Sequence, residues 1–134
     1  MQQYLIKYVI TFVVFMGIDL IWLGYIARRL YVNYLGDFLR TPPNWPVAFL
    51  FYGLFVLGLL IYAIEPATNA GDVKKAIALG ALFGFFTYMT YDLTNLATLK
   101  NWPTTIVVID IIWGTILGAC VAGLSTFIYL LISK

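Results

Sequence analysis

Three aspartates lie in stretches that are otherwise apolar enough to cross a membrane. Asp19 and Asp110 each begin an Asp-x-x-Trp motif, and Asp92 begins the sequence Asp-Leu-Thr-Asn. A carboxyl group at bilayer depth opposes membrane insertion by roughly 2.5 to 3.5 kcal/mol, so such residues are retained mainly where they bind or carry charge. The three acids therefore predict an intramembrane polar site.

The composition indicates an integral membrane protein. Of 134 residues, 63% are hydrophobic and 10% charged, and the mean hydropathy is +0.93, whereas soluble domains are about half apolar. Each predicted span is near the roughly 20 residues that cross a bilayer core. We predict one all-α domain, residues 1–134, a bundle of four transmembrane helices at about residues 5–26, 46–64, 76–99 and 104–131.

Several kinds of chemistry are excluded by residues that the chain lacks. It contains no histidine, which is the commonest metal ligand and neutral-pH proton carrier, and its single cysteine excludes an internal disulfide. We expect no metal and no cofactor. No basic run suggests nucleic acid. Lysine and arginine divide equally, four and four, between the two predicted surfaces, so the positive-inside rule gives no orientation.

The tripeptide Asn-Trp-Pro stands before two of the predicted spans, at residues 44–46 and 101–103. Proline suits the first helical position and tryptophan the membrane interface, so each copy predicts a helix start at the same surface. Either the chain is a tandem repeat of two helical hairpins, or one interface signal is used twice. The Asp-x-x-Trp motifs do not support the repeat, because they fall in non-equivalent spans.

The connecting segments predict little chemistry. Residues 28–41 place most of their apolar side chains on one face, which predicts a short interfacial amphipathic helix or a prolongation of the first span. Residues 65–72 predict a polar turn. The second span, 46–64, has no aspartate, glutamate, lysine or arginine, and we expect it to act as scaffold.

The three acids lie in one layer of the membrane. Counting 1.5 Å per residue from the helix ends nearest the Arg28/Lys100 surface, Asp19 lies about 12 Å deep, and Asp92 and Asp110 each about 10 Å. Trp22 and Trp113 follow their acids by three residues, on about the same helix face.

The third span has a polar side, while the fourth has a small-residue step. Gly114 and Gly118 in the fourth span allow another helix to approach closely. Polar residues in the third span form two neighbouring stripes that cover a little under half of its circumference, namely Tyr88, Asp92 and Asn95, and Thr87, Tyr91, Thr94 and Thr98.

The motifs resemble a bacterial family of small predicted inner-membrane proteins of unknown function. The resemblance is carried by Tyr-Asp-Leu-Thr-Asn-Leu-Ala-Thr at residues 91–98, followed by Trp102, Asp110 and Trp113, with Asp19-x-x-Trp22 near the start. It implies a compact four-helix protein of the bacterial inner (plasma) membrane. The plan of four short helices with a carboxylate in the first is also similar to that of small multidrug-resistance transporters.

These observations leave three hypotheses. Aspartates held in one site share protons, which suits exchange of protons against a cation or small polar solute. Alternatively, the same site serves a lipid-binding protein or lipid-modifying enzyme, with aspartates as general acid or base or as ligands of a divalent cation. In the third, the protein is a structural subunit whose partner surface is the Gly114-x-x-x-Gly118 step.

A purely structural role is the less favoured hypothesis for the three aspartates. Interhelical hydrogen bonds average only about 0.6 kcal/mol, less than the cost of inserting the acids. We expect membrane lipids and a small cationic or polar solute or a lipid substrate as partners, and a bundle this small is compatible with a homodimer. The predicted ligand- or proton-binding set is Asp19, Trp22, Tyr88, Tyr91, Asp92, Thr94, Asn95, Asp110 and Trp113.

Overall fold

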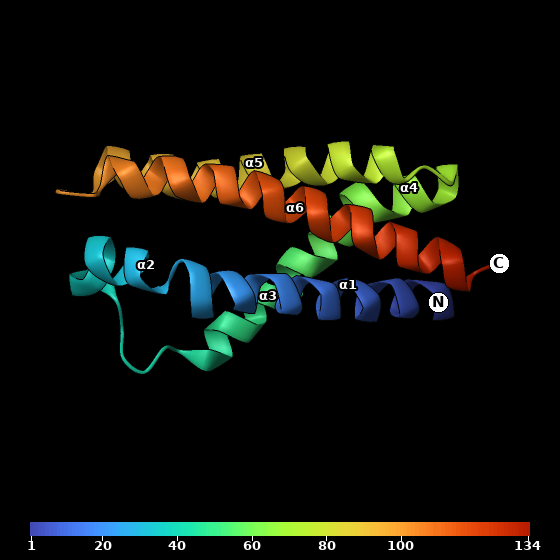
Figure 1. The fold of residues 1–134 in the computed structure, drawn as a ribbon, viewed down its shortest axis with the longest axis horizontal. Coiled ribbons are helices and arrows are strands. Elements are labelled where there is room, and N and C mark those ends of the chain that lie inside the picture. Colours follow the sequence, from blue (N-terminus) through green and yellow to red (C-terminus); the bar gives the residue numbers. More distant parts are fainter.

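The computed structural model describes residues 1–134 as helices joined by short turns (Figure 1). Four helical stretches are long and apolar enough to cross a membrane. Both chain ends lie at one end of the bundle, and α2 lies at the other (Figure 1). The elements are α1 (Gln2–Ile21), η1 (Trp22–Ile26), α2 (Arg28–Leu35), η2 (Gly36–Phe38), α3 (Trp45–Leu59), η3 (Leu60–Ile64), α4 (Glu65–Ala70), α5 (Val73–Thr98) and α6 (Thr104–Ile132).

The prediction of four helices long and apolar enough to cross a membrane is confirmed, and the largest difference is in the second. The second span runs from Trp45 to Ala70, because α3 continues through the π-helical turn η3 into α4. The predicted polar turn at residues 65–72 is therefore wrong for its first six residues, which are helical. Pro66 is compatible with this because it lies at the start of α4, and Gly71 ends the helix with a left-handed φ of 63°.

The two Asn-Trp-Pro copies start helices in different ways. Asn44 caps α3 by accepting a hydrogen bond from the backbone N–H of Val47 at 3.4 Å, and Pro46 lies in the first turn. In the second copy Asn101 adopts a left-handed φ of 59°, and Pro103 is the N-cap residue. Helix α6 therefore begins at Thr104, one residue after the proline. Both helix starts are confirmed, but only Pro46 is inside its helix. The tandem repeat remains a prediction.

Helices α5 and α6 form the tightest pair in the bundle, side by side and antiparallel (Figure 1). Gly80 and Gly84 of α5 face Gly118 and Gly114 of α6 so closely that a Cβ atom at Gly80, Gly84 or Gly118 would strike the backbone carbonyl group of the opposite helix. The predicted small-residue step is thus used inside the chain. It is not free as the partner surface of a structural subunit.

The apolar core lies on the chain-end side of the aspartate layer. Phe15 from α1, Val56 and Leu59 from α3, and Leu117 and Val121 from α6 are completely buried and pack together. On α1, the core-facing series is Lys7, Thr11, Phe15 and Asp19, spaced four residues apart. This spacing puts the acid of α1 on the same face as its core residues.

A buried ion pair lies near the end of the bundle that holds the chain termini. The Lys7 ammonium donates to a carboxylate oxygen of Glu65 at 2.6 Å, and the Lys7 side chain is only 4% exposed. The ammonium also lies 4.7 Å from the centroid of the Tyr129 ring. This pair joins α1 to the end of the second span, so Glu65 has a structural partner that the sequence pattern did not indicate.

The outer surface of the bundle is apolar. Large hydrophobic side chains such as Val13, Leu54, Leu82 and Leu124 are about half exposed or more. An exposed apolar surface on every helix is the surface expected against lipid.

The glycine contact predicts an asymmetric response to added methyl groups. Gly84→Ala should lower the free energy of unfolding by about 1 to 3 kcal/mol, because the new Cβ meets the Gly114 carbonyl group on rigid backbone. Gly17→Ala is the matched control, since nothing lies within 4 Å of a Cβ there. Thermal unfolding in detergent, followed by circular dichroism, measures both. Equal stability of the two variants would contradict the close approach.

Candidate functional site

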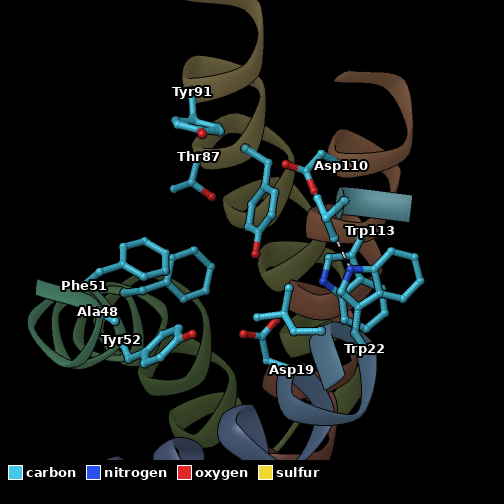
Figure 2. A pocket seen from close by; sticks show the side chains of 13 residues that line it. Asp19, Trp22, Ala48, Phe51, Tyr52, Thr87, Tyr91, Asp110 and Trp113 are labelled. Carbon is cyan, nitrogen blue, oxygen red and sulfur yellow. Dashed lines mark hydrogen bonds between the residues drawn. The ribbon is translucent and has the colours of Figure 1, made fainter. Parts of the chain in front are cut away.

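A cavity of about 420 Å³ opens at the level of the aspartates and is lined by six helical elements, α1, η1, α2, α3, α5 and α6. Figure 2 shows Asp19, Trp22 and Trp113 on one side and Ala48, Phe51 and Tyr52 of α3 on the other. Ten of its thirteen lining residues are hydrophobic, and no lysine or arginine lines it. The lining residues are Asp19, Trp22, Leu23, Tyr31, Ala48, Phe51, Tyr52, Phe55, Thr87, Tyr88, Tyr91, Asp110 and Trp113.

The three acids are buried and form a chain of electrostatic neighbours. Asp19 is 5% exposed, Asp110 9% and Asp92 0%. The carboxyl group of Asp110 interacts with those of both Asp92 and Asp19. Asp19 and Asp110 line the cavity, whereas Asp92 does not. Asp110 is therefore the acid that connects the other two.

Asp92 has no hydrogen-bond donor from the protein. Neither of its carboxylate oxygens has a partner, although both are completely buried. Its position follows from the α5–α6 contact, because Ala76, Gly80, Gly84 and Asp92 form the buried series of α5. A buried ionised carboxylate without a partner is costly, so this side chain is stable there only with a proton or a counter-ion.

The two tryptophans of the Asp-x-x-Trp motifs stack on each other. The ring centroids of Trp22 and Trp113 are 4.1 Å apart, and the rings are nearly parallel at 7°. Trp22 lies in the π-helical turn η1, which ends α1. Ile26, the last residue of this turn, is 63% exposed. The stack joins α1 to α6 beside the cavity.

Tyr31 links this stack to the acids. Its hydroxyl group accepts a hydrogen bond from the Trp22 indole N–H at 3.3 Å and donates one to a carboxylate oxygen of Asp110. Burial raises the pKa of the Tyr31 phenol above its ordinary value, and the hydrogen bond to Asp110 raises it further. The phenol therefore keeps its proton and remains a donor to Asp110.

Tyr31 was not among the predicted site residues. Residues 28–41 were predicted to form an interfacial amphipathic helix or to prolong the first span. In the structure Leu35 of α2 packs against Trp102 and against Ile106 and Val107 of α6. An amphipathic pattern is the same whether its apolar face meets lipid or protein. The one available signal was a phenol on that apolar face, because a buried tyrosine hydroxyl needs a hydrogen-bond partner.

The second span contributes to the cavity wall and is more than scaffold. Tyr52 and Phe51 of α3 line the cavity, and the Phe55 ring lies 5.2 Å from Phe83 and 6.3 Å from Tyr88, centroid to centroid. Tyr88 in turn lies against Gly114, since a Cβ there would meet its ring. The absence of charged residues concealed this wall, which is built from aromatic rings.

The polar side of α5 only partly faces the cavity. Tyr88, Tyr91 and Thr87 line it, while Asn95 is half-buried and outside the lining. Thr94 is exposed, and its hydroxyl group donates to the backbone carbonyl of Thr90. Threonine satisfies its hydroxyl group in this way within a helix, so a stripe of threonines does not require a polar partner helix.

The site is poorly suited to a divalent cation. No three acidic, histidine or cysteine side chains are grouped so that they could hold a metal ion. Ca²⁺ takes six to eight oxygen ligands, whereas the cavity wall offers mainly aromatic carbon.

The hydrogen bonds of Tyr31 give a test of this arrangement. Tyr31→Phe should lower the free energy of unfolding by about 1 to 3 kcal/mol, because it leaves the Trp22 N–H and the Asp110 carboxyl group without their partner. Tyr25→Phe is the matched control, since Tyr25 is 91% exposed. Denaturant titration in detergent, followed by tryptophan fluorescence, compares the two. Identical unfolding curves would show that Tyr31 does not join Trp22 to Asp110.

Comparison with known proteins bears on the whole chain. No curated protein and no solved structure matches it. Residues 4–127 match the family described as predicted membrane protein DUF2177. The matched range contains all three aspartates, both tryptophans of the stack and Tyr31. The chain therefore belongs to this family of predicted membrane proteins.

Proposed function

We propose that this membrane protein binds a cation in the aspartate cavity and exchanges it against protons. The bacterial inner membrane, which the sequence resemblance implies, is the proposed location. The observation that carries the proposal is the absence of a compensating charge. Asp19, Asp92 and Asp110 are all buried, and no lysine or arginine lines the cavity to which Asp19 and Asp110 contribute.

Charge balance explains why a proton and a cation would compete. Two carboxyl groups as close as those of Asp92 and Asp110 repel each other when both are ionised. One shared proton removes that repulsion. A cation in the cavity achieves the same result, so its arrival favours release of the proton. Each ligand thereby disfavours the other, which is the coupling that an exchanger requires.

The surrounding groups have separate roles in this proposal. Asp110 and Asp19 contact the cation from the cavity wall, and Asp92 holds the proton behind Asp110. Tyr31 orients the Asp110 carboxyl group through its hydrogen bond. The stacked rings of Trp22 and Trp113 keep the wall rigid.

A lipid-binding protein or a lipid-modifying enzyme is the second candidate. The observation that favours it is the mainly hydrophobic lining at membrane depth, which an acyl chain would also fit. In that case Asp110, with the Tyr31 phenol beside it, would serve as general acid or base. Mass spectrometry of lipids incubated with the purified protein would show a converted product if this candidate is correct.

Proton release tests the exchange directly. Addition of tetramethylammonium chloride to purified protein in weakly buffered detergent should acidify the solution, because the bound cation displaces a proton. Asp92→Asn and Asp110→Asn should each abolish the release, and Asp110→Asn should also weaken cation binding about tenfold or more, the loss expected for one charge-assisted contact. A pH-indicator dye and isothermal titration calorimetry measure the two quantities.

The control for these variants is Asp37→Asn, which removes an exposed acid outside the spans. It should release protons as the unaltered protein does. The exchange proposal is wrong if cations of graded size release no protons, or if release persists in both aspartate variants.

A further inference from the structure

A shallow apolar groove continues from the aspartate cavity along the lipid-facing side of α5. The groove has a volume of about 630 Å³, and five of its seven lining residues are hydrophobic, among them Leu79, Leu82 and Phe86. Thr87 lines both the groove and the cavity. From Leu79 to Thr90 the groove follows about 16 Å of helix. One elongated molecule could therefore occupy both spaces.

The opening of the cavity faces the same side. The second span contacts α5 mainly through η3 and α4, whereas α3 contacts α5 mainly through Phe55 and through Gly58 against the Phe83 ring. Toward the Arg28/Lys100 surface, Phe51 and Tyr52 of α3 and Thr87 and Tyr91 of α5 form separate walls (Figure 2). The cavity is thus accessible from the side, between two helices that border lipid.

The residues that line the cavity indicate which polar group an elongated ligand would place there. Eight of the thirteen lining residues are aromatic, and two are aspartates. Aromatic faces attract organic cations, and cages of such rings recognise quaternary ammonium groups. A phosphate or sulfate group would find no lysine or arginine in the lining. A small metal ion would find few oxygen ligands in place of its water shell.

We infer that the substrate is a single-chain amphiphilic cation, whose ammonium group enters the cavity between α3 and α5 while its alkyl chain lies in the groove of α5. This inference rests on the proposed function, since it names the class of cation that is exchanged. The ammonium group meets Asp19 and Asp110, and the chain contacts Leu79, Leu82 and Phe86.

Photolabelling in lipid nanodiscs tests where the chain lies. The probe is a dodecyltrimethylammonium carrying a diazirine at the end of its chain, and the labelled residues are identified by mass spectrometry. We expect label at Leu79, Leu82 or Phe86, lost when excess tetramethylammonium occupies the cavity. A dodecyl sulfate with the same diazirine should not concentrate label there. These comparisons use the unaltered protein, so they do not depend on a variant that folds.

Two substitutions on α5 provide a second arm. Leu82→Trp fills the groove and should remove most of the groove label, whereas Leu93→Trp, at an exposed position outside the groove, should leave it unchanged. Proton release by tetramethylammonium should persist in Leu93→Trp.

The outcomes distinguish the two claims. If tetramethylammonium releases protons but the label spreads over lipid-facing residues and resists competition, the inference is wrong and the exchange proposal stands. If groove label with the sulfate probe equals that with the ammonium probe, the inference is also wrong. If no cation releases protons and none protects the groove from label, both claims fail.

Discussion

The backbone contact between α5 and α6 is the constraint on which the rest of the structure depends. At Gly80, Gly84 and Gly118 the two helices approach so closely that a Cβ atom would strike the backbone of the opposite helix. That approach brings the buried face of α5, including Asp92, directly against the face of α6 that carries Asp110. It also leaves room for the Tyr88 ring against Gly114. The acids are neighbours because the glycines permit it.

The rest of the chain is arranged around this pair in two different ways. At the end that holds the termini, α1 and the second span are fixed by a packed core and by the buried Lys7–Glu65 ion pair. Removing one partner of such a pair leaves an uncompensated buried charge. Toward the opposite surface the contacts become aromatic and leave a cavity. The bundle thus combines a closed half with a half able to accommodate a ligand.

The sequence predicted features that depend on length, hydropathy and depth. The four spans follow from apolar segments of membrane length, and the burial of all three aspartates agrees with their common depth. The sequence could not predict which side chains of different helices contact each other, because those contacts depend on how the helices pack. Tyr31 and α2 belong to a segment that was predicted to be interfacial or to prolong the first span, because an amphipathic pattern does not show what covers its apolar face. Glu65 was predicted to be a loop residue, although its partner is the distant Lys7, and Thr94 was predicted to be a site residue, although its partner is on its own helix. The sequence of a polar residue does not show which kind of partner it has.

The chain order of the acids has a consequence for how the protein enters the membrane. Asp92 and Asp110 lie on consecutive helices joined only by residues 99–103, so they can shield each other from lipid as soon as that hairpin forms. Asp19 lies on the first helix, and its carboxylate neighbour, Asp110, is at the other end of the chain. During biosynthesis the first helix therefore carries the cost of an exposed acid, and it gains a carboxylate neighbour only when the last helix arrives.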